Sequence, residues 1–468
     1  MLFSTLVRVF APAPHRPRRP PDEVRRAYPW FRWSIIESTF LGYATFYLVR
    51  NNLSTVSKDL QAALHYNADM IGTITAVTAL SYGVGKFLMG NLSDRSNPRT
   101  FMAFGLLLTA ACNFAFGGTA SYTAHLLLWT LNGFVQGMGW PPCGRSMGHW
   151  FAENERGLTF SIWNTSHNCG GAAAGVIAAY AANHFGGWQY AFFVPGVLAL
   201  IGALYLLVRL RDTPQSVGLP PIEEYAGYRV GREQPAPSLE RELTTRELFI
   251  DYVLKNPWIW LLAFANFFAY VSRYSLLDWA PKYLRDVKGA TLTQGGWAIF
   301  WNETGGIPST ILLGWLSDRL GGRRGMVATV CLVPILVAFA VILFTPPGFL
   351  WLDYTMMAVV GLCIYPVINF IVIMALDLTS KKAIGTAAGF IGLLGYLGRM
   401  AQAKGFGWIV HHYEPTYGLA GAWRIVFWVI LACTAMALLL MAMTWRVSVQ
   451  RHSRGFPRAA AGNDEPSG

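Results

Sequence analysis

Residues 33–53 read WSIIESTFLGYATFYLVRNNL, an apolar stretch that carries the cation Arg50. The stretch is long enough to cross a bilayer, which requires about 20 apolar residues. A guanidinium in the hydrocarbon layer costs about 2.5–3.5 kcal/mol even on a lenient insertion scale, so it should face protein, water or an anion. The alternative is an arginine near a helix end that extends to the lipid headgroups. Tyr43, Tyr47 and Arg50 recur at helical spacing, so we expect one helix face to carry two phenols and a cation.

A second stretch repeats this pattern in the later part of the chain. Residues 258–284 read WIWLLAFANFFAYVSRYSLLDWAPKYL, with Arg273 inside and Tyr270 one turn before it. Arg273 follows Arg50 by 223 residues, and Asp318 in GWLSDRLGGRRG follows Asp94 in GNLSDRSNPR by 224. Two unrelated features with nearly the same spacing indicate an internal duplication. If the halves pack about a pseudo-twofold axis, the two arginines face each other where transporters built from repeats bind their substrate.

The composition predicts an all-α polytopic membrane protein. Of 468 residues, 53% are hydrophobic and 13% charged, against about 25% charged residues in a soluble domain. The mean hydropathy is +0.35. We expect twelve spanning helices in two pseudo-twofold-related halves of six, near residues 33–56, 67–92, 99–118, 122–149, 157–183, 187–209, 257–284, 293–316, 325–345, 352–378, 383–411 and 421–446.

The remaining segments are polar. Residues 1–32 form a segment rich in Pro and Arg that we expect to run along the cytoplasmic surface before the first half, 33–209. Residues 210–256 read as a cytoplasmic linker with a short amphipathic helix near 241–253. The second half covers 257–446, and the tail 447–468 ends in a composition typical of disorder.

The net charge of +12 comes from short loops and tails, so it does not indicate a nucleic-acid partner. The turns near 118–123, 184–188 and 345–350 carry no Lys or Arg, whereas the alternate loops and both tails are basic. The positive-inside rule therefore predicts that both termini and the linker lie in the cytoplasm.

Nothing in the sequence indicates catalysis or a cofactor. The six cysteines lie in apolar stretches without metal-ligand spacing, and we expect buried thiols. Walker loops, dinucleotide-binding glycine patterns and nucleophile–base pairs are not visible in the sequence. We therefore expect no enzyme activity, no metal and no cofactor.

Other polar side chains interrupt the apolar stretches. Two guanidinium groups from opposite halves suit an oxyanion, because the arginine fork binds phosphate at two points and stays charged. Asn164 and His167 share a helix face and would add hydrogen bonds. Further candidates are Lys86, Trp140 beside the helix-breaking Pro141 and Pro142, Asp278 and Glu303. We expect the two carboxylates to pair with Lys86 and Arg273 when no anion is bound, because unpaired buried ions are costly.

At this level of detail the sequence resembles a known family. The paired loops GNLSDRSNPR and GWLSDRLGGRRG resemble the loop motif of the major facilitator superfamily. GYATFYLVRNN, QGMGWPPCGR, NERG, WNTSHNCGG, DTPQSVGLPPIEEY, KKAIGTAAGF and GYLG are similar to its organophosphate:phosphate antiporters, and point to the glycerol-3-phosphate carriers among them.

The resemblance implies the major facilitator fold and a carrier of the bacterial inner membrane that imports glycerol-3-phosphate in exchange for inorganic phosphate. It implies no cofactor, and we expect a functional monomer in the bilayer. By the same resemblance, Arg50, Arg273 and His167 contact phosphate. It implies supporting roles for Lys86, Trp140, Trp163, Asn164, Tyr270, Asp278, Glu303, Tyr365 and Tyr396.

Three departures leave the substrate open. Asn51 stands where glycerol-3-phosphate carriers have a lysine, and phosphoglycerate carriers look similar there. Ile391 stands where hexose-phosphate members have a lysine, which argues against a hexose phosphate. Arg399 replaces a small residue; it either reads a second anionic group or pairs internally or with headgroups.

Alternatives of another class are a sugar-phosphate membrane sensor without flux and a proton-coupled symporter in which Asp278, Glu303 or His167 titrates. The short tails favour a carrier over a sensor.

Overall fold

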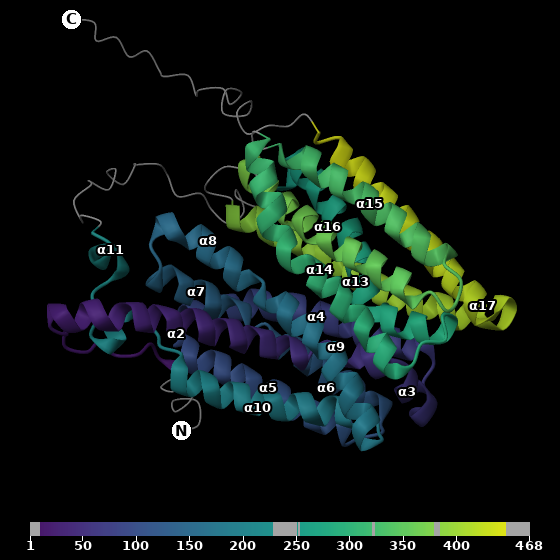
Figure 1. Cartoon of the computed structure of the whole chain (residues 1–468), viewed down its shortest axis with the longest axis horizontal. Helices are drawn as coiled ribbons and strands as arrows, with labels where there is room; N and C mark the ends of the chain where they lie inside the picture. Colours follow the sequence, from purple (N-terminus) through teal and green to yellow (C-terminus); the bar gives the residue numbers. More distant parts are fainter. Residues whose placement is uncertain (1–9, 228–249, 251–252, 321–322, 379–383, 446–468) are drawn as a thin grey trace, which may run out of the picture.

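The computed structural model describes residues 10–227, 250, 253–320, 323–378 and 384–445, and these ranges are built from helices (Figure 1). The predicted all-α class is confirmed. The expected helix near 241–253 lies largely outside the described residues, and the tail 447–468 lies wholly outside them.

The first half is divided into more helices than we predicted. Its elements are α2 (Pro21–Leu48), α3 (Asn52–Leu64), α4 (Ala68–Asp94), α5 (Pro98–Gly117), α6 (Tyr122–Gln136), α7 (Trp140–Trp150), α8 (Glu153–Asn164), α9 (Ser166–Phe185) and α10 (Tyr190–Arg209). Two short elements follow, the 3-10 helix η1 (Pro214–Val217) and α11 (Ile222–Tyr225). Three of the six spans are therefore pairs of helices, α2–α3, α6–α7 and α8–α9.

The second half has longer helices. They are α13 (Pro257–Val287), α14 (Leu292–Arg319), α15 (Arg324–Phe344), α16 (Leu350–Asp377) and α17 (Ile384–Ala442). Gly418 interrupts α17 with φ 70° and ψ 169°, so this element contains both of the last two predicted spans. Figure 1 shows the halves as two bundles, purple to teal and green to yellow.

By length and apolar composition, six of the described helices suffice to cross a membrane: Ala68–Asp94, Pro98–Gly117, Tyr190–Arg209, Arg324–Phe344, Leu350–Ala375 and Ala387–Ala442. The other predicted spans are interrupted or carry more polar side chains. They supply Arg50, His167, Arg273 and Glu303.

Two predictions about the start of the chain are wrong. Helix α2 begins at Pro21 rather than near residue 33, because proline is well suited to the first helical turn. Part of the expected surface segment is therefore helical. The segment before residue 33 packs on the start of the linker. The Tyr28 hydroxyl donates to the carbonyl of Pro220, and the amide of Ala13 donates to Asp212. The helix also ends at Leu48, so Arg50 lies in a break and not inside a continuous helix.

The halves meet toward one end of the molecule, which we call the closed end and which carries the turns 65–67, 118–121, 186–189 and 288–291. Helix α4 packs on α17, and α9 packs on α14. Glycines permit these approaches: a Cβ at Gly175 would lie 2.7 Å from the carbonyl oxygen of Gly296, and one at Gly72 would lie 2.5 Å from that of Ala403. Small residues at such contacts let helix backbones come close together in a membrane.

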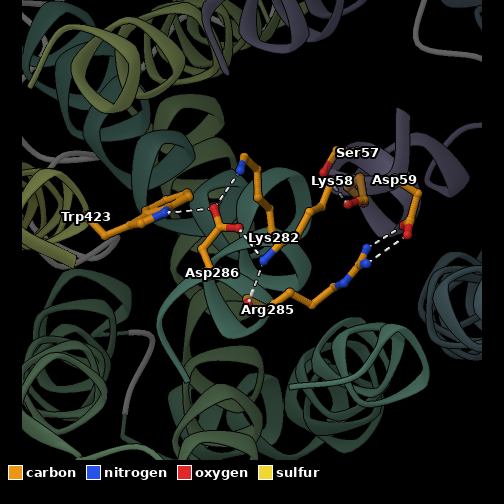
Figure 2. A network of polar contacts seen from close by, with 8 residues as sticks. Ser57, Lys58, Asp59, Lys282, Arg285, Asp286 and Trp423 are labelled. Carbon is orange, nitrogen blue, oxygen red and sulfur yellow. Dashed lines mark hydrogen bonds and ion pairs between the residues drawn. The ribbon is translucent and has the colours of Figure 1, made fainter. Parts of the chain in front are cut away.

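Charged side chains also join the halves at the closed end (Figure 2). Lys58 of α3 lies 3.1 Å from Asp286 of α13, and Arg285 of α13 pairs with Asp59 of α3. At a second point, Lys404 of α17 lies 2.6 Å from both carboxylate oxygens of Asp69 on α4.

Candidate functional site

Arg50 owes its position to the break between α2 and α3. Neither proline nor glycine lies in residues 49–51. Instead, the side-chain amides of Asn113 and Asn132 each donate to the carbonyl of Val49 at 3.1 Å, and Gln136 donates to that of Phe46 at 3.1 Å. These amides satisfy carbonyls that the end of α2 leaves without helical partners. Sequence analysis missed them, although three amides in apolar helices were a visible signal.

The guanidinium of Arg50 is enclosed by aromatic rings. Its Cζ lies 3.9 Å from the ring centroid of Tyr47 and 4.8 Å from that of Tyr82, and the residue is 7% exposed. Its Nε is buried without a hydrogen-bond partner. The expectation that Tyr47 and Arg50 share a face holds despite the break.

Arg273 has an equivalent environment in the second half. It lies within the continuous helix α13, with its Cζ 4.4 Å from the ring centroid of Tyr365 and 5.0 Å from that of Tyr274. The residue is 8% exposed, and its Nε is also buried without a hydrogen-bond partner. Sequence analysis did not single out Tyr274 or Tyr82, although Tyr274 directly follows the arginine.

His167 connects the two environments. Its ring centroid lies 5.8 Å from that of Tyr47, which packs on Arg50, and 5.3 Å from that of Tyr365, which packs on Arg273. The residue is buried, at 8% exposed. Three rings thus place the two guanidinium groups around one central region between the halves.

The expected pairing of the carboxylates is wrong for both residues. Glu303 of α14 accepts hydrogen bonds from Asn168 of α9 at 2.8 Å and from the Tyr365 hydroxyl at 2.5 Å. It is fully buried, and within the described residues no ion pair joins it to Arg273 or Lys86. Glu303 can reach Asn168 because α9 and α14 are in close contact at this point. A Cβ at Gly171 of α9 would lie 2.8 Å from the Glu303 carboxyl carbon.

Asp278 pairs with Arg399 of α17 and not with Lys86 or Arg273. The physical reason is that α13 packs closely on α17. Internal pairing, one of the interpretations left open for Arg399, is what the structure shows. Lys86 instead lies with its Nζ 5.4 Å from the ring centroid of Trp140, at the start of α7.

The remaining candidates form two aromatic groups beside the arginines. In the first half the Tyr43 ring stacks on Trp163 with centroids 5.3 Å apart, and Asn164 is the last residue of α8. Between the halves, Tyr396 of α17 lies 5.2 Å from Tyr82 and 5.6 Å from Tyr270, measured between ring centroids.

The charge balance of this region favours an anion. Among the residues that the structure describes, Arg50 and Arg273 have no carboxylate within ion-pair distance, and both are nearly fully buried. The buried Trp163 Nε1 is a further donor without a partner. Buried donors and cations without partners are costly, so an oxyanion bound between them would offset that cost. No group of three or more His, Cys, Asp or Glu side chains suited to a metal occurs in the described part of the chain.

Comparisons with known proteins agree with this architecture. Residues 39–403 match the family model of the Major Facilitator Superfamily. The chain is 38% identical over 446 residues to the glycerol-3-phosphate transporter of Bacillus subtilis, covering 94% of this chain and 98% of that protein. It is 37% identical over 439 residues to a probable hexose phosphate transport protein of Chlamydia trachomatis, covering 92% and 94%.

Two further similarities concern signalling and fold. The chain is 34% identical over 430 residues to the membrane sensor protein UhpC of Escherichia coli, covering 90% of this chain and 93% of that protein. A solved structure of a bacterial homologue of the human lysosomal transporter Spinster, inward-facing and unoccupied, has a TM-score of 0.72 at 16% identity, covering 92% and 99%. The latter similarity shows the fold alone.

Proposed function

Because the chain belongs to the Major Facilitator Superfamily, and within it to the family of the glycerol-3-phosphate and hexose phosphate transporters, we propose that it exchanges glycerol-3-phosphate for inorganic phosphate. The observation that carries this proposal is the pair Arg50 and Arg273. One buried guanidinium comes from each half, and each has an Nε without a hydrogen-bond partner. A phosphate group offers the acceptors that both forks lack.

The arginine pair also supports exchange rather than one-way transport. In the empty site two like charges resist the approach of the halves, and a bound phosphate dianion neutralises them. Closure around the anion is then more favourable than closure of the empty site. Inorganic phosphate on the return step keeps the pair neutralised, so the outward phosphate gradient drives uptake by alternating access.

The positive loops support an orientation with both termini in the cytoplasm. The closed end, where Arg285 pairs with Asp59, would then face the outside of the inner membrane. We propose that the carrier works as a monomer, since each half contributes one of the two arginines of a single site.

The test is phosphate counterflow with purified protein in proteoliposomes. Vesicles loaded with unlabelled phosphate should take up labelled phosphate, and external glycerol-3-phosphate should inhibit this uptake at lower concentration than glucose-6-phosphate. Dissipating the pH gradient while phosphate is present inside should leave the exchange intact. Uptake that requires a pH gradient and no internal phosphate would support proton-coupled symport instead.

The similarity to the sensor protein UhpC is the observation that favours a second candidate, an organophosphate sensor. A sensor would bind phosphate esters without flux. Ligand-induced thermal stabilisation together with absent counterflow would favour this alternative.

A further inference from the structure

Helices α13 and α17 are joined by a buried, hydrogen-bonded ion pair. Arg399 donates to Asp278 at two points, 2.8 Å from Nη2 to Oδ1 and 3.2 Å from Nε to Oδ2. Gln402 donates to Oδ2 of the same carboxylate at 2.7 Å. Arg399, Asp278 and Gln402 are 5%, 9% and 2% exposed, so this carboxylate and this fork are shielded from water.

The pair lies next to the proposed phosphate site. The Cζ of Arg399 is 4.1 Å from the ring centroid of Tyr274, and the Cζ of Arg273 is 5.0 Å from the same centroid. Arg399 and Arg273 therefore share the ring of Tyr274. A third guanidinium therefore adjoins the two of the proposed site.

The third guanidinium differs from the other two in its partners. The Nε atoms of Arg50 and Arg273 have none, whereas the Nε of Arg399 is bonded to Asp278. The region thus presents two uncompensated forks, and the charge of the third is cancelled within its own half. A second anionic group on a substrate would have to take Arg399 from Asp278 and would be repelled by that carboxylate.

We propose that Asp278 masks Arg399 and thereby sets the substrate class: a phosphate monoester with an uncharged remainder is accepted, and one with an additional carboxylate is disfavoured. This inference rests on the proposed function. Asp278 acts here as a specificity-determining residue, through the arginine that it holds.

Two probes isolate this effect. Glycerol-3-phosphate and 3-phosphoglycerate share the phosphate ester and the hydroxyl on C2, and they differ at C1, which is a hydroxymethyl group in one and a carboxylate in the other. The ratio of their half-inhibitory concentrations against labelled phosphate uptake reports on C1 recognition alone. Changes that affect the phosphate site cancel in this ratio.

The test compares the wild type, Asp278→Asn and the double variant Asp278→Asn with Arg399→Gln in proteoliposomes. Asp278→Asn releases the fork, so the ratio should shift toward 3-phosphoglycerate by about tenfold, the effect of one charged hydrogen bond. The double variant removes the released charge and should return the ratio to the wild-type value. An unchanged ratio in Asp278→Asn, or a shift that persists in the double variant, would overturn the proposal.

The double variant keeps the test decisive if Asp278→Asn is not recovered as folded protein. It replaces a neutral ion pair by two neutral amides, so the proposal requires an unchanged ratio. A shift of several-fold against 3-phosphoglycerate would mean that Arg399 already binds the carboxylate in the wild type, and masking would be refuted. If the wild type shows no exchange, the proposed function fails. The ratio of the two ligand-induced thermal shifts in detergent then still tests masking.

Discussion

Arg285 of α13 donates two hydrogen bonds to Asp59 of α3, one of them 2.8 Å from Nη2 to Oδ1, and so joins the two halves at the closed end (Figure 2). The neighbouring Lys58 reaches back across the same boundary to Asp286 at 3.1 Å and to the backbone carbonyl of Arg285 at 2.9 Å. Lys282 adds a 2.5 Å bond to Asp286, whose side chain is 1% exposed. The contacts form a network, and networks contribute more than isolated surface ion pairs.

We predict that this network stabilises the closed end against opening. Arg285→Gln should reduce the population of the closed arrangement by roughly fivefold, corresponding to about 1 kcal/mol. The measurement is the disulfide cross-linking rate between Asn183→Cys and Thr293→Cys, in a variant without the six native cysteines. These two side chains lie 2.7 Å apart across the halves, so the rate reports on closure.

Two controls define this prediction. Arg18→Gln removes an exposed ion pair between the N-terminal segment and Glu224 of the linker, and it should leave the cross-linking rate unchanged. The exchange of charges in Asp59→Arg with Arg285→Asp should recover part of the lost rate. Equal rates in Arg285→Gln and the parent would show that the network does not hold the closed end.

The second prediction concerns the arginine forks. Arg50→Lys and Arg273→Lys keep the charge but lose the planar two-point grip, so the apparent affinity for phosphate should fall by about tenfold or more in each variant. Concentration dependence of phosphate counterflow measures this directly. Arg211→Lys is the matched control, because Arg211 bonds the carbonyls of Val208 and Leu210 away from the proposed site. Near-normal affinity in both site variants would remove Arg50 and Arg273 from the phosphate site.

Relationships between residues close together in the chain could be predicted from the sequence. Tyr47 and Arg50 stand three residues apart, and their ring and guanidinium lie 3.9 Å apart in the structure. The apolar stretches similarly predicted the helices, because crossing a bilayer requires a minimum apolar length. Such features follow from helical periodicity, which can be read from the spacing of residues in the sequence.

Relationships between helices could not be predicted in the same way. Asp278 was expected to pair with Lys86 or Arg273, and its partner is Arg399, 121 residues further along. The outcome depends on how α13 and α17 are rotated against each other, which spacing within either helix does not determine. The break before Arg50 was missed for a related reason, since amides from other helices stabilise it and no proline or glycine marks it.

The third prediction concerns the backbone contact between α4 and α17. A Cβ at Gly72 would lie 2.5 Å from the carbonyl oxygen of Ala403, so Gly72→Ala should destabilise the protein by about 1–3 kcal/mol through overpacking. Thermal unfolding in detergent should show a lower midpoint. Gly392→Ala in α17 is the control, because a Cβ there would have no neighbour within 4 Å and alanine favours helix. A midpoint lowered equally by both substitutions would mean that the close approach is not the cause.

The fourth prediction concerns the amides that hold the break before Arg50. Asn132 of α6 donates to the carbonyl of Val49 at 3.1 Å and does not approach Arg50 through any hydrogen bond within the described residues. Asn132→Leu leaves that carbonyl with one fewer donor in an apolar setting and should destabilise the fold by about 1–3 kcal/mol. Because the break determines where the guanidinium lies, the apparent affinity for phosphate should fall as well, by about tenfold.

Thermal unfolding and phosphate counterflow together separate the two parts of this effect. Thr130→Val on the same helix is the matched control, since the Thr130 hydroxyl bonds the Leu126 carbonyl one turn earlier in α6. That variant should retain the affinity for phosphate. A variant Asn132→Leu with a lower unfolding midpoint but unchanged phosphate affinity would show that the amide supports the fold without positioning Arg50. The arginine would then have to be held by its contacts with Tyr47 and Tyr82 instead.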